Sequence, residues 1–211
     1  HVLTVSEFSK QDIAQYYRLS PDRITVTYEA AESANTTCSP EHAAEAMRQY
    51  GIEKPYILYV GNAYPHKNLE VLLNTMKVIK DREGHIPWNL VLVGRKDYFY
   101  SRLEHQAWAY DIDDHVVFPG FVSDADLPCL YQHADAYIFP SKYEGFGLPP
   151  LEAMMYGTPV IAARSSCLPE ILGNAALYFD PEDISGIIKA VNSVRSDPSV
   201  RSALIEQGRT Q

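Results

Sequence analysis

One stretch decides the fold: Ala136-Tyr-Ile-Phe-Pro140-Ser-Lys-Tyr-Glu144-Gly-Phe-Gly147-Leu-Pro-Pro-Leu-Glu152-Ala-Met154. It runs from a short apolar segment, typical of a buried strand, through a loop with two glycines into a helix. Pro149 and Pro150 suit the first turn of that helix, because its first N–H groups have no partners inside the helix. The stretch therefore predicts a strand–loop–helix unit with a carboxylate on each side of the turn.

Short apolar runs and helical patterns alternate from residue 56 onward. Several of the runs lack polar alternation, as strands buried on both faces do. This alternation predicts an α/β fold with a doubly wound, Rossmann-like parallel sheet, whose ligand binds outside the carboxyl ends of the strands. The predicted strands are Tyr56–Val60, Asn89–Val93, Val116–Phe118, Ala136–Phe139, Pro159–Ala162 and Ala176–Phe179. The predicted helices are Asn68–Asp81, Tyr98–Tyr110, Ala125–His133, Pro149–Tyr156, Leu168–Leu172, Asp183–Arg195 and Ser199–Gln207.

The first fifty residues follow a different pattern. His1–Ser6 is typical of a strand that leads into a helix at Glu7, with Ser6 as its N-cap. A second strand is expected at Ile24–Tyr28, then a polar stretch, then a helix at Glu41–Tyr50. The chain is thus expected to begin in the middle of a βα unit.

Composition and charge exclude several classes of protein. The 211 residues include 18 Lys and Arg and 27 Asp and Glu, for a formal net charge of −9, and 46% of them are hydrophobic. This mixture excludes disordered, collagen-like and disulfide-scaffold proteins, and no apolar run reaches the ~20 residues that span a bilayer. The acidic balance argues against broad nucleic-acid binding, which depends on Lys and Arg. A few local cations and a helix N-terminus can still hold a small anion.

The three cysteines, Cys38, Cys129 and Cys167, are odd in number, widely spaced and without CxxC pairing. This usage predicts buried free thiols in a reducing compartment, with neither a zinc site nor a disulfide framework. Asn35-Thr36-Thr37 matches a glycosylation sequon, to which we give no weight because no secretory signal opens the sequence.

The loop that follows Pro140 has the features of a ligand site. Gly145 and Gly147 can present N–H groups without obstruction, and the helix N-terminus behind them favours an anion. A carboxylate accepts paired hydrogen bonds from vicinal hydroxyls such as those of ribose or a hexose. The loop lacks the third glycine of the dinucleotide motif GxGxxG, and no GxxxxGK[ST] phosphate loop occurs. Lys67 follows the Pro65 turn on the same predicted edge of the sheet.

At this point a family resemblance is clear. The segment EGFGLPPLEAMMYGTPVIAA, residues 144–163, resembles the E-x7-E signature of retaining glycosyltransferases of the family 4 type, which have the GT-B fold. Nearly the whole chain takes part. The other matching segments are TVSEFSKQDI (the junction into the second domain), YILYVGNAYPHKNL (the phosphate-binding loop), VVFPGFVSDADLPCLYQHADAYIFPS (the base-binding region) and LPEILGNAALYFDP (the stretch after the signature).

The resemblance implies roles for individual residues. Glu144 matches the glutamate beside the donor sugar, Glu152 the one that binds the ribose hydroxyls, and Lys67 the lysine that neutralises the diphosphate. Glu144 and Lys67 are therefore the catalytic candidates. The loop residues whose backbone amides are expected to meet the sugar and the diphosphate are Gly145, Phe146, Gly147 and Leu148.

The phosphate-binding loop departs from the family pattern at one position. Many relatives carry an arginine after the loop glycine, but here Gly61 is followed by Asn62, which donates hydrogen bonds and brings no charge. Lys67 then carries more of the charge compensation, and Arg95 and Lys96 are candidate auxiliaries.

Three further residues are weighed for contact with the donor. Phe121 and Val122 match the segment whose backbone reads the base edge, and ordinary core packing is the open alternative. His66 adjoins Lys67 and is a candidate contact for a phosphate or a sugar.

Two DxD patterns, Asp111-Ile-Asp113 and Asp124-Ala-Asp126, match the metal signature of the other large glycosyltransferase fold. Neither sits at the C-terminal end of a buried strand, so both are interpreted as structural, with Asp124 as the cap of the next helix. No metal and no cofactor are expected.

The function expected from the resemblance is retaining transfer of a hexose from a nucleotide-diphosphate sugar to a glycan, lipid or other acceptor, with GDP-mannose favoured. The alternatives are a nucleotide-binding module without transferase activity and a nucleotide-sugar epimerase. Residues 1–28 are expected to be a junction from an N-terminal acceptor domain that this sequence lacks, and residues 29–211 the donor-binding domain. The expected location is the cytoplasm, including the inner face of the membrane through the absent half, with no nucleic-acid partner.

Overall fold

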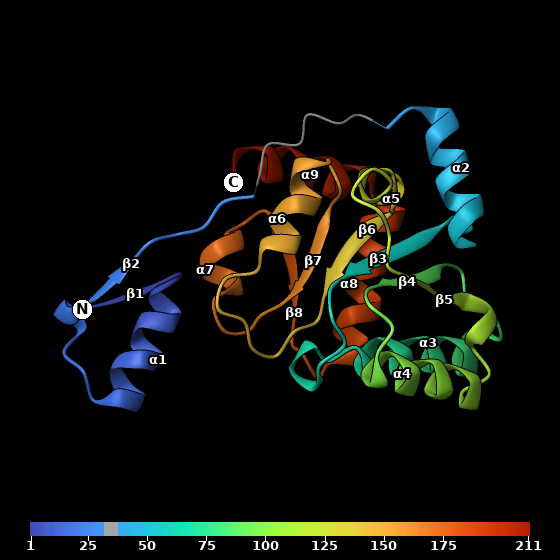
Figure 1. The fold of residues 1–211 in the computed structure, drawn as a ribbon. Coiled ribbons are helices and arrows are strands. Elements are labelled where there is room, and N and C mark those ends of the chain that lie inside the picture. Colours follow the sequence, from blue (N-terminus) through green and yellow to red (C-terminus); the bar gives the residue numbers. More distant parts are fainter. Residues whose placement is uncertain (32–37) are drawn as a thin grey trace.

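The computed structural model of the chain describes residues 1–31 and 38–211. The sequon at residues 35–37 lies outside the described residues. Figure 1 shows a body built on one parallel sheet, from which the N-terminal segment extends to one side.

The central sheet has six parallel strands in the order β5-β4-β3-β6-β7-β8. The predicted α/β class with a doubly wound sheet is confirmed. The strands are β3 (Tyr56–Val60), β4 (Asn89–Val93), β5 (Val116–Gly120), β6 (Ala136–Phe139), β7 (Val160–Ala163) and β8 (Ala176–Phe179).

This strand order places a topological switch point between β3 and β6. From β3 the chain builds outward through β4 to β5, and from β6 it builds in the opposite direction through β7 to β8. The loops after β3 and β6 therefore diverge to opposite sides of the sheet. Ligands of open α/β sheets bind in the crevice that such a switch point leaves at the carboxyl ends of the strands.

Helices cover both faces of the sheet. In Figure 1, α3 and α4 lie below the strands, whereas α5, α6 and α9 lie above them. Helix α8 packs against α3 and α9, and α2 packs against α5. The bounds are α2 (Pro40–Tyr50), α3 (Glu70–Glu83), α4 (Tyr98–Ala109), α5 (Leu127–His133), α6 (Leu148–Met155), α7 (Leu168–Leu172), α8 (Ile184–Ser196) and α9 (Pro198–Thr210). Short 3₁₀ turns lie at Pro21–Arg23, Pro65–Lys67 and Asp113–His115.

The core lies on the inner strands of the sheet. Every residue of β6 and β7 is buried, as are the first four residues of β3. This burial explains why these strands read as continuous apolar runs rather than as alternating ones. In the described residues, no helix is long and apolar enough to cross a membrane.

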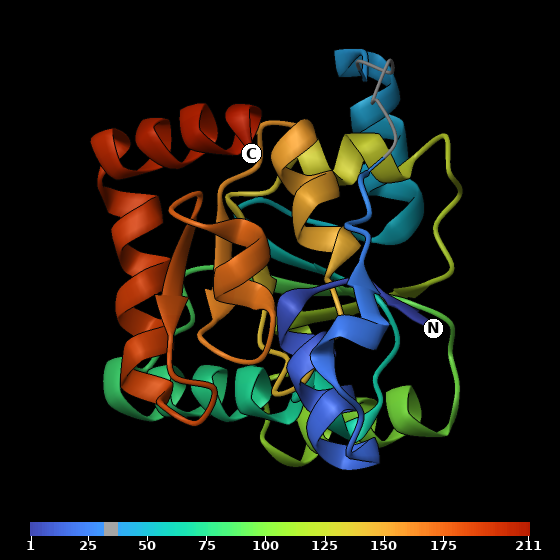
Figure 2. The ribbon, with the colours of Figure 1, turned by 90° about the vertical axis from the view of Figure 1, so that its left-hand side faces the viewer.

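The N-terminal unit consists of β1 (Val2–Thr4), α1 (Glu7–Tyr17) and β2 (Ile24–Val26), with β1 and β2 paired in parallel. Figure 2 looks from the side of this unit and shows α1 in front of the body. Ser6 is the N-cap of α1, as predicted, and its Oγ accepts a hydrogen bond from the amide of Ser9 at 3.1 Å.

Hydrogen bonds made by Ser6 and by Glu170 are among the contacts that join the N-terminal unit to the body. Ser6 Oγ donates to the carbonyl oxygen of Gly145 at 2.7 Å. The carboxylate of Glu170, on α7, accepts from the amides of Glu7 and Phe8 at 2.7 and 3.0 Å and from the hydroxyl of Tyr28 at 2.9 Å. A carboxylate at this position also suits the positive end of the α1 dipole.

The expectation of three free thiols is wrong for two of them. Cys38 and Cys129 form a disulfide, although 91 positions separate them in the sequence. The pairing arises because α2 packs against α5 and brings Cys38, which precedes the N-cap of α2, beside the middle of α5. Cys167 is a buried free cysteine, as predicted.

The prediction that Asp124 caps the next helix is also wrong. Helix α5 begins at Leu127, and Asp126 occupies the N-cap position. Asp126 accepts hydrogen bonds from Tyr50, Ser123 and His42, which holds it in a structural role. The other DxD pattern lies between α4 and β5, where Asp111 pairs with Lys80. The pattern at Asp124–Asp126 lies in the loop between β5 and α5.

Candidate functional site

An ion pair spans the switch point of the sheet. Lys67 ends the short turn after β3, and Glu144 lies in the loop after β6. The Nζ of Lys67 donates to Oε1 of Glu144 at 2.6 Å, and the two side chains are only 14% and 11% exposed. The same Nζ lies 5.5 Å from the ring centroid of Phe139, at the end of β6. The structure therefore brings together the two residues that the sequence singled out as catalytic candidates.

Backbone contacts fix both ends of this pair. The amide of Lys142 donates to the carbonyl oxygen of His66 at 2.8 Å and so joins the β6 loop to the β3 loop. Next to Lys67, the side-chain amide of Asn68 donates to the carbonyl oxygens of Pro140 and Pro181. The two loops thus form one connected unit at the carboxyl ends of β3 and β6.

Buried tyrosines hold the phosphate-loop candidate, a feature that sequence reasoning missed. The carbonyl oxygens of Val60, Gly61 and Asn62 accept from the hydroxyls of Tyr137, Tyr100 and Tyr59 at 3.2, 2.7 and 2.7 Å. All three tyrosines are almost fully buried, and burial raises their pKa, so the hydroxyls stay protonated donors. The signal in the sequence was the abundance of tyrosine within apolar runs.

Gly94, at the end of β4, permits this arrangement. A Cβ at Gly94 would overlap the carbonyl oxygen of Gly61 and the hydroxyl of Tyr100. The amide of Gly94 donates to the carbonyl of Gly120 at the end of β5, and the amide of Gly61 donates to that of Val93. The ends of three neighbouring strands therefore meet closely, with no side chain at position 94 between them.

The signature loop leads directly into α6. Gly147 has a φ of 101°, which side-chain-bearing residues rarely adopt, and it occupies the N-cap position of α6. Its lack of a side chain leaves the start of the helix without a side-chain cap. Because Pro149 and Pro150 have no N–H, Leu148 is the one residue among the first three of α6 that has a backbone amide donor.

The rest of the loop is held by buried neighbours. The side chain of Phe146 is 6% exposed, so we expect this residue to meet a ligand mainly through its backbone. The thiol of Cys167 lies 3.2 Å from the carbonyl oxygens of both Glu144 and Phe146, and Ser166 Oγ accepts from the amide of Glu144 at 3.0 Å. Burial raises the pKa of Cys167 to about 11, which keeps this thiol a neutral donor.

Glu152 faces a separate pocket of about 240 Å³. Its Oε2 accepts from the hydroxyl of Tyr131 at 3.2 Å. The ring of Tyr131 stacks on that of Tyr156, with the centroids 5.4 Å apart. The other residues that line the pocket are Asp124, Leu127, Pro128 and Met155. Glu152 is thus placed with α5 rather than in contact with the Lys67–Glu144 pair.

The remaining candidates after β3 and β4 lie at the same edge of the sheet but are more exposed to solvent than Lys67 and Glu144. The side chains of Asn62 and His66 are exposed after β3, as are those of Arg95 and Lys96 after β4, and Lys96 pairs with Glu104. Their contact with a phosphate or a sugar stays a prediction.

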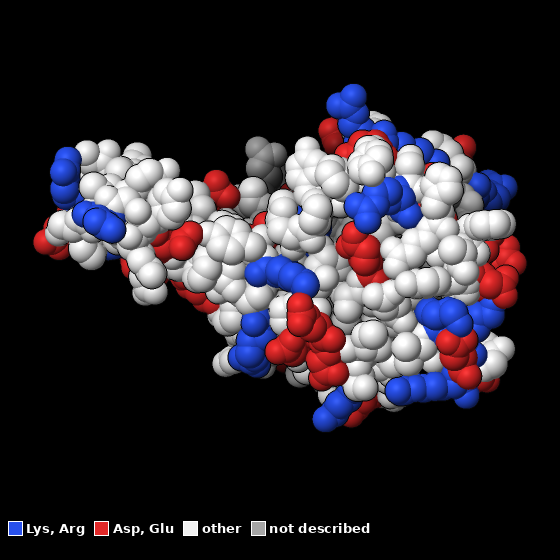
Figure 3. Space-filling model, turned by 90° about the horizontal axis from the view of Figure 1, so that it is seen from below, with Lys and Arg blue, Asp and Glu red and all other residues white. Residues whose placement is uncertain are grey.

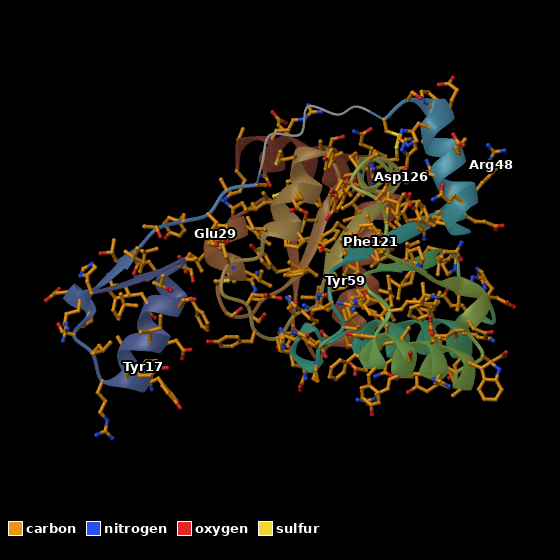
Figure 4. All side chains as sticks on the ribbon, in the orientation of Figure 1. Tyr17, Glu29, Arg48, Tyr59, Phe121 and Asp126 are labelled. Carbon is orange, nitrogen blue, oxygen red and sulfur yellow. A yellow bond between two sulfur atoms is a disulfide. The ribbon has the colours of Figure 1, made fainter. Side chains whose placement is uncertain are left out.

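Phe121 and Val122 follow β5, and their side chains differ sharply in exposure to solvent. Phe121, labelled in Figure 4, is 77% exposed, whereas Val122 is 4% exposed. The side chain of Val122 therefore packs in the core, whereas the ring of Phe121 is exposed to solvent. The reading of a base edge by this segment stays a prediction.

Comparison with known proteins decides the family. The family model described as "Glycosyl transferases group 1" matches residues 43–211. The chain belongs to this glycosyltransferase family. The match includes the ion pair, the signature loop and the Glu152 pocket.

Curated relatives of this glycosyltransferase domain include several mannosyltransferases. It is 33% identical to O-antigen chain mannosyltransferase B of Escherichia coli over 100% of this chain and 55% of the relative. It is 34% identical to O-antigen chain mannosyltransferase RfbU of Salmonella typhimurium over 96% of this chain and 53% of the relative. The chain thus spans about half the length of these relatives.

Solved structures agree with the GT-B glycosyltransferase fold. A glycosyltransferase from Rickettsia africae superposes with a TM-score of 0.83 at 21% identity, over 99% of this chain and 58% of that one. Anabaena Alr3699/HepE in complex with UDP-glucose superposes with a TM-score of 0.84 at 19% identity, over 99% and 57%. The expected likeness to one half of a GT-B architecture is confirmed.

Proposed function

We propose that this chain is the donor-binding half of a retaining mannosyltransferase that uses a nucleotide-diphosphate sugar, with GDP-mannose as the donor. The observation that carries the proposal is the Lys67–Glu144 ion pair at the switch point between β3 and β6. Both side chains are largely shielded from solvent and lie at the edge of the sheet where ligands bind. The ammonium group of Lys67 can pair with the diphosphate, and the carboxylate of Glu144 can accept hydrogen bonds from the sugar hydroxyls.

When the diphosphate binds in this proposal, it partly replaces Glu144 as the partner of Lys67. Without a donor, the ammonium group is neutralised by Glu144 at 2.6 Å. A diphosphate placed beside Lys67 takes over part of this pairing, and Glu144 becomes free to accept hydrogen bonds from the sugar. The amide of Leu148 and the positive end of α6 add to the stabilisation of the leaving diphosphate. In this proposal these fixed charges act without a metal or a cofactor.

The proposed nucleoside end of the donor lies toward Glu152. A pocket of about 240 Å³ is smaller than the ~300–1,000 Å³ that holds a whole drug-sized ligand, so it suits one part of the donor. Tyr131 occupies one oxygen of Glu152, and the remaining lone pairs suit the two hydroxyls of a ribose.

The names of the relatives support mannose as the sugar. Two relatives are O-antigen mannosyltransferases. The chain is also 27% identical to a GDP-mannose-dependent mannosyltransferase of Mycolicibacterium smegmatis, over 81% of this chain and 46% of the relative. Neither alternative, a module without transferase activity or an epimerase, gains support from these names.

We further propose that residues 1–28 belong with an acceptor-binding half of the whole protein, and residues 29–211 with the donor half. The acceptor is then a glycan or a lipid-linked glycan at the inner face of the membrane. A nucleic-acid partner is not proposed: the net charge is −9, and the face in Figure 3 shows basic and acidic side chains interspersed.

Calorimetric titration of GDP, GDP-mannose, UDP and ADP into the chain tests the proposal. We expect GDP and GDP-mannose to bind more tightly than UDP and ADP. Lys67→Met should weaken GDP binding by about ten- to a hundredfold, since hydrogen bonds to charged groups contribute about 1.5–3 kcal/mol.

Lys77→Met is the matched control, because Lys77 forms an exposed ion pair with Asp81 on α3. It should bind GDP as the wild type does. Preference for UDP would overturn the assignment of mannose, and unchanged GDP binding by Lys67→Met would overturn the proposed diphosphate site.

A further inference from the structure

A cluster of three metal-ligating side chains lies where α2 meets α5. The ligand atoms of Cys38, His42 and Cys129 all lie within 4.8 Å of one another. Cys38 directly precedes the N-cap of α2, His42 is in the first turn of α2, and Cys129 is in the middle of α5. In Figure 4 the sulfur-to-sulfur bond lies between these helices, near the labelled Asp126.

Each of the three residues is held in place by further contacts. The amide of Cys38 donates to Oε1 of Gln132 on α5 at 3.1 Å. Ser39 caps α2 by accepting from the amide of His42 at 3.2 Å, and Nε2 of His42 lies 2.7 Å from Oδ1 of Asp126. Partners of this kind orient the ligands of metal sites.

We propose that, when its two thiols are reduced, this cluster binds one zinc ion through Cys38, His42 and Cys129. Two sulfurs and an imidazole form a soft ligand set that zinc prefers, whereas magnesium and calcium require oxygen ligands. Three residues separate Cys38 from His42, a number that also occurs between the paired Cys and the paired His ligands of structural zinc sites. A water molecule completes four-fold coordination, and Asp126 remains the outer partner of His42.

The zinc state and the disulfide exclude each other. Reduction of the disulfide by dithiothreitol transfers two electrons and two protons to the sulfurs, and the reductant becomes its cyclic disulfide. When zinc binds, each thiol releases its proton to the buffer. Both states tie α2 to α5, and α5 carries three of the residues that line the Glu152 pocket. The zinc site is therefore a structural clasp beside the proposed donor site and independent of the chemistry there.

Metal analysis of the reduced chain tests this proposal. The protein is reduced with dithiothreitol, freed of metal with a chelator, desalted without oxygen and titrated with zinc. We expect about one zinc per chain by mass spectrometry of the metal. With cobalt in place of zinc, we expect thiolate-to-metal charge-transfer absorption. The oxidised chain should take up neither metal at this site.

Variants separate the site from adventitious binding. His42→Ala and Cys38→Ser should weaken zinc binding by more than the ~10–100-fold that loss of an outer partner costs. The side chain of His42 is 42% exposed, so its variant is expected to fold, and circular dichroism checks this. His105→Ala, which removes an exposed histidine from α4, should bind zinc as the wild type does. Reduced wild-type protein that takes up no more zinc than His42→Ala would overturn the proposal. GDP titration of the same samples tests the proposed donor binding independently, so that failure of one proposal is distinguished from failure of the other.

Discussion

At the scale of single residues, Glu144 and Glu152 are expected to have different roles. Glu144 is paired with Lys67 at the switch point, whereas Glu152 faces the pocket with Tyr131. Glu152→Ala should therefore weaken GDP binding by about ten- to a hundredfold, because it removes a charged acceptor from the proposed ribose contact. Glu144→Ala should not lower GDP affinity, because the diphosphate then no longer competes with Glu144 for Lys67, and it should impair binding of the sugar part of GDP-mannose.

Calorimetric titration of GDP and GDP-mannose into both variants measures this difference. Equal losses of GDP affinity in the two variants would contradict the division of roles. Glu206→Ala, which removes an exposed carboxylate on α9, provides the control for a change in net charge.

Cys167 gives a second prediction at this scale. Its thiol is buried behind the signature loop, and its pKa is about 11, so only about one thousandth of it is thiolate at pH 8. In reduced protein with a chelator present, iodoacetamide should label Cys38 first and leave Cys167 unmodified. Peptide mapping by mass spectrometry measures both sites, and unfolding in urea should make Cys167 reactive. Rapid labelling of Cys167 in the folded chain would contradict the burial described here.

At the scale of elements, the tyrosine contacts to the loop after β3 are open to test. Tyr100→Phe removes the hydroxyl that lies 2.7 Å from the carbonyl oxygen of Gly61. The free energy of unfolding should fall by about 1–3 kcal/mol, because a buried acceptor loses its partner. GDP affinity should fall as well, since the phosphate loop is less well fixed.

Urea unfolding and GDP titration measure the two effects. Tyr98→Phe is the matched control, because Tyr98 lies on the same helix and is 71% exposed. Equal unfolding free energies for the two variants would show that the Tyr100 hydroxyl does not hold the loop.

Glu170 links the N-terminal unit to the body, and its loss should loosen that unit. Glu170→Ala removes the acceptor for the amides of Glu7 and Phe8 and for the Tyr28 hydroxyl. Hydrogen exchange should then quicken across residues 2–26 and remain unchanged in β3 and β6. Unchanged exchange in α1 would show that Ser6 and its neighbours suffice to hold the unit.

The same scale shows what the sequence could and could not predict. The bounds of β3, β4 and β6 were predicted correctly, because each is an apolar run between turn-forming or polar residues. Strand β5 is longer than predicted, since Gly120 still pairs with Val93 on β4. The start of α5 was placed too early, because Asp126 is held by side chains from α2 and the preceding loop.

Within the candidate site, residues that belong to one local motif were found from the sequence. Lys67 and Glu144 each follow a predicted strand, and parallel strands bring such residues to one edge. The tyrosine contacts and the Cys38–Cys129 pair depend on elements that meet only in the folded chain. A separation of 91 positions leaves no local pattern for the disulfide.

At the scale of the whole molecule, we expect this chain to bind nucleotide and to transfer no sugar by itself. The sheet has its own core, and the proposed phosphate, sugar and ribose contacts all lie within residues 61–152. Transfer also requires an acceptor held in line with the anomeric carbon, and such positioning contributes about 7–11 kcal/mol. Nucleotide affinity should be weak, on the order of micromolar to millimolar, without a second domain to close over the donor.

An activity assay with labelled GDP-mannose measures this, with the chain beside a full-length protein of the length of its relatives and the same acceptor. Turnover by the chain alone that equals that of the longer protein would show that the acceptor site lies within these 211 residues.

Gly94 sets a practical limit on engineering the choice of donor. One methyl group at this position would overlap both the Gly61 carbonyl and the Tyr100 hydroxyl. In a random library that varies codon 94, we therefore expect the chains with a side chain at this position to misfold. Exposed side chains at the same edge can vary without such a collision. The positions where diversity should be placed are Asn62, Arg95 and Phe121. A selection for a new nucleotide sugar should keep codon 94 invariant and sample these three together.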